Sequence, residues 1–130
     1  DAAYAGDFQI GTFPAGLCSR EGDDGRVRDL EWKKSFVAKS VETHRDVIPV
    51  YFSGLNSRVF YKFAKFRKKL GIKFNIELIL LPGEMVKNRG SKFEIRVGKP
   101  IPWTTFTSAR RSGEWAEIVK DKVYGMADEQ

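Results

Sequence analysis

A serine and an arginine that follow a short proline- and glycine-containing turn are the most informative chemical groups in this sequence. The turn is Phe13-Pro14-Ala15-Gly16, and Ser19 and Arg20 come within four residues of it. A hydroxyl and a guanidinium at the end of a strand can bind a phosphate or a carboxylate, because arginine pairs with either group in a bidentate geometry. The competing interpretation is an ordinary strand-to-loop turn with a solvated arginine, and composition alone favours it.

The sequence contains one cysteine, Cys18, and one histidine, His44. A single cysteine excludes an intramolecular disulfide and a cysteine-rich zinc site, and a single histidine excludes every site that needs two. We expect no metal site, and we also expect no cofactor. We interpret His44 as a solvated residue at the end of a helix, and we do not expect Cys18 to act as a nucleophile.

A second signal is a basic stripe on the helix expected over residues 57–70. Its members recur at spacings of four, three and four, which places them on one helical face: Arg58, Lys62, Lys65 and Lys69. The apolar residues of the same segment lie around the other side of the helix, and they pack on the core if the basic stripe is only a solvated face: Val59, Phe60, Phe63, Phe66 and Leu70. The stripe is either a solvated face, or a surface that lies on anionic lipid headgroups or docks an acidic acyl carrier protein. Arg67 falls within the aromatic side, and its role is open.

The composition indicates a folded, basic chain of single-domain length. The 130 residues are 42% hydrophobic and include ten Phe, four Tyr and three Trp, which excludes disorder as the main state. The formal net charge of +6 indicates an anionic partner, such as a phosphate-bearing molecule, nucleic acid, an acidic carrier protein or a membrane surface. The apolar runs, such as residues 47–52, are far shorter than the roughly 18 to 20 residues that span a bilayer.

Hydrophobic periodicity predicts a βαβ crossover in the first half of the chain. Residues 8–13 alternate as a strand does, and residues 14–29 are a polar, glycine-rich surface loop. A helix over 29–43, with Asp29 as its N-cap, then leads to an apolar strand over 47–52 that is covered on both faces.

Further elements follow after the basic helix, which Gly71 ends. Residues 73–81 fit a strand and a helix equally well, and a short helix over 83–88 follows Pro82 and ends at Gly90. Residues 93–97 alternate as a half-exposed strand, and Ser112 caps a last amphipathic helix. The expected fold class is α/β, with a mainly parallel sheet and flanking helices.

Residues 13–20 resemble the Phe-Pro-Glu-Gly-Thr-Arg-Ser block of the lysophospholipid and glycerol-phosphate acyltransferase family. Val47-Ile48-Pro49-Val50 resembles that family's next block, and the stretches that begin at Val47, Leu81 and Arg96 are similar to its hemolysin-like bacterial branch, which includes acyltransferases of amino-acid-containing lipids. The first block departs from the family at Ala15 and Cys18, and its arginine, Arg20, stands two positions later. The resemblance covers about residues 8–124.

The resemblance implies transfer of a fatty acyl group from CoA or acyl carrier protein to a hydroxyl group of a lysophospholipid, glycerol-phosphate or acyl-amino-acid lipid acceptor. In the resembled mechanism a histidine deprotonates this hydroxyl and an aspartate orients the histidine. That His-x-x-x-x-Asp motif precedes the matched blocks in the family and is absent here, because the fifth residue after His44, where the aspartate would stand, is Pro49. We therefore expect residues 1–130 to be a single domain, the C-terminal portion of an acyltransferase domain, with no catalytic residue and no turnover of its own.

The resemblance also assigns binding roles. Phe13, Pro14, Gly16, Ser19 and Arg20 would bind substrate, with Ser19 and Arg20 near the acceptor headgroup. The protein would act as a peripheral protein at the cytoplasmic membrane face, and its truncated sheet would favour self-association.

The competing hypothesis is a non-enzymatic basic module that binds nucleic acid. It is suggested by the charge and the interleaved basic and aromatic residues of 58–69, although no nucleic-acid motif is present.

Overall fold

The structure is a computed structural model that describes residues 2–71 and 79–127. Its contacts divide the chain into two compact units, and each is described by itself. Unit 1 comprises residues 1–18, 29–52 and 95–130, and unit 2 comprises residues 19–28 and 53–94.

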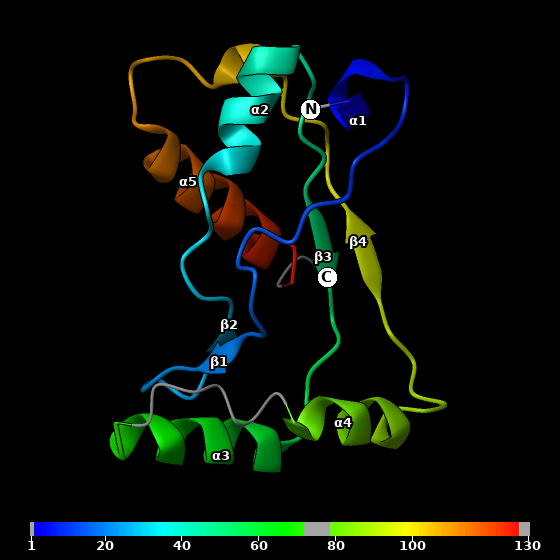
Figure 1. Cartoon of the computed structure of the whole chain (residues 1–130), viewed down its shortest axis with the longest axis vertical. Helices are drawn as coiled ribbons and strands as arrows, with labels where there is room; N and C mark the ends of the chain where they lie inside the picture. The colour runs from blue at the N-terminus through cyan, green and yellow to red at the C-terminus, as the bar shows by residue number, and fades with distance from the viewer. Residues whose placement is uncertain (1, 72–78, 128–130) are drawn as a thin grey trace. The chain divides into compact units, whose positions relative to one another are not determined.

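Both units mix helices with short strands (Figure 1). Unit 1 contains α1 (Ala2–Ala5), α2 (Ser35–Thr43), β3 (Val50–Phe52), β4 (Ile95–Val97), the 3-10 helix η2 (Trp103–Thr105) and α5 (Ser112–Gly125). Unit 2 contains β1 (Arg20–Glu21), β2 (Val27–Arg28), α3 (Arg58–Lys69) and α4 (Leu81–Lys87). The helices predicted over 57–70, over 83–88 and from residue 112 are confirmed, although α4 begins earlier, at Leu81, and Ser112 lies inside α5 with Arg111 at the cap position. Most of the ambiguous segment 73–81 lies outside the described residues.

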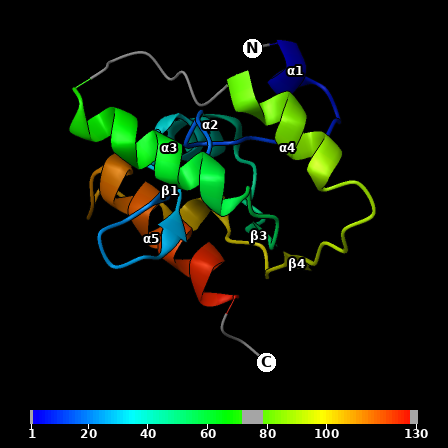
Figure 2. The same cartoon turned by 90° about the horizontal axis from the view of Figure 1, so that it is seen from below.

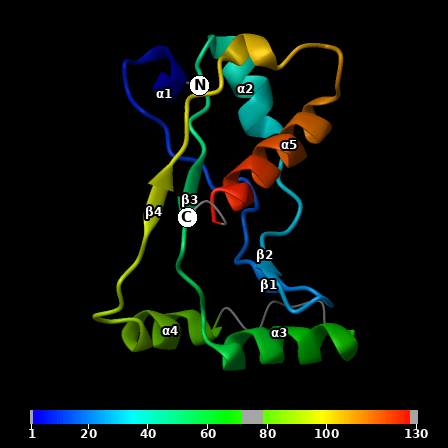
Figure 3. The same cartoon turned by 180° about the vertical axis from the view of Figure 1, so that it is seen from behind.

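The strands correct the predicted sheet. β1 pairs with β2 and β3 pairs with β4, both antiparallel, and the described part of the chain contains no parallel pair. Figures 1 and 3 show β3 and β4 side by side. The α/β class is confirmed, but the mainly parallel sheet and the βαβ crossover are wrong.

Residues 8–13 form no strand, because their neighbourhood satisfies the backbone in another way. The Arg45 guanidinium donates to the carbonyl oxygen of Phe8 at 2.7 Å, and also to that of Gly6. The side chains of Phe8 and Phe13 are exposed, so no sheet face holds this segment in a ladder. The alternation of residues 8–13 was therefore a misleading strand signal.

The strand expected over 47–52 is shortened by its proline. Val47 exchanges two backbone hydrogen bonds with Ile101, at 2.9 and 2.8 Å, and the Pro49 carbonyl accepts one from Gly98 at 2.8 Å. Proline has no N–H for the ladder, so regular pairing begins only at Val50. The side chains of Val50 and Phe52 are exposed, which corrects the prediction of a strand covered on both faces.

The helix expected from Asp29 begins later, at Ser35, because earlier backbone donors have other partners. The Trp32 N–H donates to the Glu117 carboxylate at 3.3 Å, and the Lys33 N–H donates to the Pro14 carbonyl at 3.0 Å. Asp29 is not an N-cap: its carboxylate accepts a 2.9 Å hydrogen bond from the Trp32 indole instead.

A single hydrophobic cluster holds α2, α5 and the segment around η2 together in unit 1. Its buried members are Trp32, Phe36, Val37, Ile101, Phe106, Ala116, Val119, Val123 and Met126. The helical spacing of the α2 and α5 members turns one face of each helix toward this cluster, as the periodicity of the sequence indicates.

Unit 2 is built on a hairpin and the buried face of α3. Phe60, Tyr61 and Ala64 are buried on this helix. The loop expected over 14–29 folds back as the β1–β2 hairpin, whose turn closes with a 3.2 Å hydrogen bond from the Gly25 N–H to the Gly22 carbonyl. Gly25 has a φ of 76°, a conformation that favours glycine. That segment is therefore an ordered element rather than an open loop.

Candidate functional site

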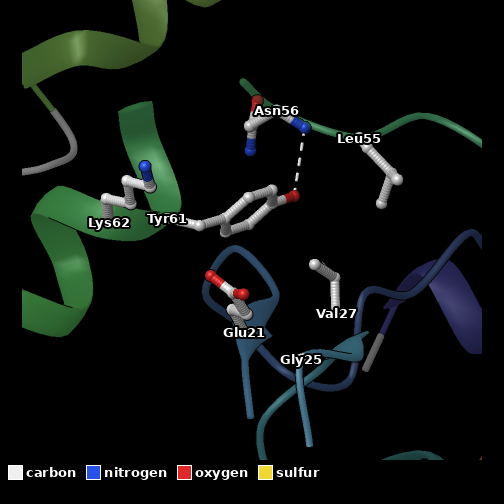
Figure 4. A pocket seen from close by; sticks show the side chains of 7 residues that line it. All are labelled: Glu21, Gly25, Val27, Leu55, Asn56, Tyr61 and Lys62. Carbon is white, nitrogen blue, oxygen red and sulfur yellow. Dashed lines mark hydrogen bonds between the residues drawn. The ribbon is translucent and has the colours of Figure 1, made fainter. Parts of the chain in front are cut away.

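A pocket in unit 2 lies between the β1–β2 hairpin and the beginning of α3 (Figure 4). Its volume is about 400 Å³. The lining residues are Glu21, Gly25, Val27, Leu55, Asn56, Tyr61 and Lys62. The wall therefore combines one carboxylate, one ammonium group, an amide and a phenol with apolar surface, which is the mixture that binds and orients a small polar headgroup.

The phenol of Tyr61 fixes the segment that leads into α3. Its hydroxyl oxygen accepts a 3.0 Å hydrogen bond from the backbone N–H of Asn56, drawn as a dashed line in Figure 4. The Tyr61 side chain is buried, so its ring forms part of the pocket lining, while its hydroxyl oxygen keeps Asn56 in place.

A buried carboxylate fixes the same wall from α4. Glu84 is 4% exposed, and it accepts hydrogen bonds from the backbone N–H of Ser57 and from the Ser57 hydroxyl, the latter at 2.8 Å. Ser57 also caps α3, because its hydroxyl oxygen accepts a 3.3 Å hydrogen bond from the Phe60 N–H. These hydrogen bonds join the residue that precedes α3 to the middle of α4; the two helices are labelled in Figure 2.

The surroundings of Glu84 favour its ionised form. The backbone N–H of Ser57 contributes most to lowering the pKa of the carboxyl below its ordinary value, followed by the Ser57 hydroxyl. Burial opposes this shift, and Lys87, whose ammonium lies 3.3 Å from a carboxylate oxygen, adds to it. The sequence places Glu84 in the Leu81-Pro82-Gly83-Glu84 stretch but gives no sign of its partner, so its role was missed.

Arg20 begins β1, next in the chain to the pocket residue Glu21, and is not among the residues that line the pocket. Its guanidinium carbon is 5.9 Å from the ring centroid of Phe60, and one guanidinium nitrogen donates to the Ser19 carbonyl at 3.3 Å. Phe60 is fully buried, so the cation rests on a fixed aromatic ring. Ser19 and Arg20, both half-buried, are thus beside the pocket residue Glu21.

A second arginine stands directly opposite the first. In the β1–β2 register Arg20 pairs with Arg28, and Glu21 pairs with the pocket residue Val27. Two arginines at facing positions of an antiparallel pair lie on the same face of the hairpin, and guanidinium groups pair with carboxylates and phosphates. Arg28 was not singled out from the sequence, because only the hairpin register brings it to Arg20.

The other predicted substrate-binding residues lie in unit 1. The Gly16 N–H donates to the Phe13 carbonyl at 3.0 Å, and Gly16 has a φ of 65°, so residues 13–16 form the predicted turn. Phe13 is 93% exposed, while Pro14 is half-buried and is held by the Lys33 N–H. Because Ser19 and Arg20 belong to unit 2, the turn and the arginine are described apart.

The described lysines of the predicted basic stripe, Lys62, Lys65 and Lys69, are exposed, and two of them also have neighbours. Lys62 lines the pocket, Lys65 lies 4.0 Å from the Asp23 carboxylate, and Lys69 is exposed. The side chain of Arg58 lies outside what the structure describes, and Arg67 is half-buried. The aromatic side is divided: Phe60 is buried, whereas Phe63 and Phe66 are 40% and 61% exposed, so only part of this side packs on the core.

His44 has the position expected for a residue that ends a helix. It is exposed, it follows α2 with a φ of 55°, and its ring centroid lies 4.3 Å from that of Trp103. Cys18 is a half-buried thiol. Across residues 2–71 and 79–127, no group of three His, Cys, Asp or Glu side chains forms a candidate metal site.

Comparison with known proteins identifies the family. The sequence profile described as acyltransferase matches residues 1–129. The chain belongs to the acyltransferase family. No solved structure matches it.

Two curated relatives of the chain within this acyltransferase family have the same name. A lyso-glycine lipid O-acyltransferase of Phocaeicola vulgatus is 54% identical over 97% of the chain, and one of Bacteroides thetaiotaomicron is 52% identical over 97% of the chain. The chain spans 45% and 46% of their lengths. Their name lies within the acyl-amino-acid lipid class expected from the sequence, and neither carries a hemolysin name.

No helix in the described part of this acyltransferase chain is long and apolar enough to cross a membrane.

Proposed function

We propose that this chain belongs to an O-acyltransferase that acylates a lyso-glycine lipid or a closely related amino-acid lipid, and that it supplies acceptor binding. The observation that carries the proposal is the identity of 54% over 97% of the chain to a lyso-glycine lipid O-acyltransferase. A phospholipid or glycerol-phosphate acceptor is the broader alternative within the same family.

The site in unit 2 supports an anionic acceptor headgroup. A glycine lipid that is acylated on its amine presents a free carboxylate, and the facing pair Arg20 and Arg28 offers two guanidinium groups for an anion. Lys62 adds a third cation on the wall of the adjoining pocket. The turn at Phe13, Pro14 and Gly16 is proposed to bind the remainder of the substrate.

In the proposed reaction the acceptor hydroxyl oxygen attacks the carbonyl carbon of an acyl thioester. A carbon–oxygen bond forms, the carbon–sulfur bond breaks, and the proton of the hydroxyl passes by way of a general base to the departing thiol of CoA or acyl carrier protein. We assign this base to a part of the enzyme outside residues 1–130, because His44 packs on Trp103 at the end of α2. The chain's own residues bind and orient the acceptor.

The test is an acceptor series with the complete enzyme. The acyl donor is labelled acyl-CoA or an acyl carrier protein that carries the labelled acyl group. The acceptor is lyso-glycine lipid, its carboxyl methyl ester, or lysophosphatidic acid. We expect transfer to the free-carboxylate lipid, and a fall in kcat/KM of about tenfold or more for the ester, because a charge-assisted hydrogen bond is lost. Transfer to none of these acceptors would contradict the function, and equal use of the ester would contradict the role of the arginines.

A matched pair of variants tests whether the preference for the free carboxylate depends on the hairpin. Arg28→Ala is expected to reduce the preference for the free carboxylate over the ester, whereas Lys99→Ala, an exposed cation in unit 1, is expected to leave that preference unchanged. Equal effects of the two changes would move the acceptor site away from the hairpin.

A further inference from the structure

The outer side of α3 carries an exposed apolar stripe that has no role in the proposed acyl transfer. Its members follow one another at spacings of four, three and four residues, and their exposed fractions are 63% for Val59, 40% for Phe63, 61% for Phe66 and 58% for Leu70. Leu70 continues the helical path, because its N–H donates to the Phe66 carbonyl at 3.1 Å. These four residues, here called the apolar stripe, therefore lie along one line on the helix.

The apolar stripe is distinct from the face on which α3 packs. Phe60, Tyr61 and Ala64 are buried in unit 2 and lie around the other side of the helix. The apolar stripe is also the basic stripe displaced by one residue, which is about 100° around an α-helix. The exposed lysines Lys62 and Lys69 consequently run along one border of it. Helix α3 thus has a packing face, an apolar face and a basic face.

Charge and exposed apolar surface occur together in unit 2. Unit 2 has thirteen Lys and Arg residues against six Asp and Glu residues, a net charge of +7, whereas unit 1 has ten against eleven, a net charge of −1. The twelve residues of α3 include six Lys or Arg and no acid. Helix α4, in the same unit, adds Met85 and Val86, which are 77% and 73% exposed.

We propose that α3 docks unit 2 on an anionic lipid surface, with the apolar stripe in the boundary between headgroups and acyl chains and the lysines among the headgroups. A helix with an apolar face and a strongly basic face, low in net hydrophobicity, is the type that lies in a membrane interface. A protein partner that matched only the apolar stripe would leave the charge of unit 2 unexplained. This proposal does not depend on the proposed acyl transfer.

The first test measures binding of the 130-residue chain to sedimenting vesicles of phosphatidylcholine, with and without phosphatidylglycerol. We expect binding to vesicles that contain phosphatidylglycerol, and a loss on the order of tenfold for the Phe63→Gln/Phe66→Gln variant. Lys62→Gln/Lys69→Gln is expected to lose about fivefold for each cation removed. The control is Phe8→Gln/Ile48→Gln, which removes two exposed apolar side chains of unit 1 and should bind as the parent does.

The second test measures insertion itself, and it remains informative if a double variant folds poorly. In Phe66→Trp the new indole is expected to be quenched by lipids brominated on their acyl chains, whereas in Phe8→Trp it is not. Equal quenching at both positions, or parent-like vesicle binding by folded Phe63→Gln/Phe66→Gln, would overturn the proposal. A mass that falls from dimer to monomer in that variant, with vesicle binding unchanged, would assign the apolar stripe to a second copy and also overturn it.

Discussion

The carboxylate of Glu84 holds Ser57, the residue next to Asn56 of the pocket wall. It is buried, it holds both the backbone and the hydroxyl of Ser57, and Ser57 in turn caps α3. A neutral side chain at position 84 would keep the size of the group but weaken these charge-assisted hydrogen bonds.

We therefore expect Glu84→Gln to destabilise unit 2 by about 1 to 3 kcal/mol at neutral pH. The measurement is hydrogen exchange of the α3 amides. Tryptophan fluorescence would not report on unit 2, because the three tryptophans, Trp32, Trp103 and Trp115, all lie in unit 1. The matched control is Glu42→Gln, whose partner Lys39 forms an ion pair at the surface. Equal protection of α3 in the two variants would contradict a special role for Glu84.

The pH dependence of α3 protection follows from the lowered pKa of Glu84. The carboxyl has a lower pKa in the folded chain than in the unfolded chain, so its stabilising contribution is fully present above the unfolded value of about 4.3. The contribution is lost as the pH falls through the lower, folded value. Protection of α3 should decline in that acidic range in the parent, and less steeply in Glu84→Gln.

Among the elements, the β1–β2 hairpin positions the proposed anion site. Its two-residue strands place Arg20 opposite Arg28, and its turn requires the left-handed backbone of Gly25. The hairpin is short, so the turn contributes a large share of what holds the register.

A pair of glycine substitutions tests this dependence. Gly25→Ala is expected to destabilise the hairpin by about 1 kcal/mol, because alanine is strained at a φ of 76°. Gly113→Ala, in the first turn of α5 where a Cβ meets open space, is expected to stabilise by about 0.5 to 1 kcal/mol. Thermal unfolding measures both changes, and a shift of the same sign in the two variants would be inconsistent with this account.

Helices were predictable here, and so were the places of β3 and β4 within the strands expected over 47–52 and 93–97, but the pairing of the strands was not. The helical spacing in α3 and α5 reports a local packing face, so sequence alone defined them well. The alternation in residues 8–13 is typical of a strand. The Arg45 guanidinium binds the carbonyl oxygen of Phe8 instead, and the segment forms no strand pairing. Pairing partners lie far apart in sequence, so the antiparallel partner of β3, residues 95–97, could not be read from local pattern.

The same limit applies to the candidate site. Arg20 and Ser19 were predicted to bind substrate from their place after the turn, whereas Lys62 was predicted only as a member of the basic stripe and not as a residue of the pocket. Arg28 and Glu84 were not predicted, because a hairpin register and a contact with Ser57 bring them into the site. The sequence left open whether the aromatic side of α3 packs on the core, since periodicity shows that a face is apolar but not what covers it.

At the level of the whole molecule, one apolar sheet face in unit 1 is exposed. In the β3–β4 register Val50 pairs with Val97 and Phe52 pairs with Ile95, and the exposed fractions of these four side chains lie between 48% and 68%. Apolar faces of this kind are sites of association. The expectation of self-association through a truncated sheet thus acquires a specific surface.

We predict that the 130-residue chain self-associates through this face. Light scattering should give a mass that rises with concentration for the parent, and a monomer mass for Ile95→Lys/Val97→Lys. Ile118→Lys, which places a lysine on the exposed side of α5, is the control and should behave as the parent does. A parent chain that stays monomeric at every concentration would contradict the prediction.

Acceptor recognition by Arg20 is the central claim, and steady-state kinetics of Arg20→Ala in the complete enzyme test it most directly. We predict that kcat/KM for lyso-glycine lipid falls about tenfold to a hundredfold, while KM for the acyl thioester changes by less than about twofold, because a charge-assisted contact to the acceptor alone is lost. Arg26→Ala, an exposed arginine on the same hairpin, is the control and should leave both values unchanged. Unchanged acceptor kinetics in Arg20→Ala, or equal losses for acceptor and donor, would contradict the account.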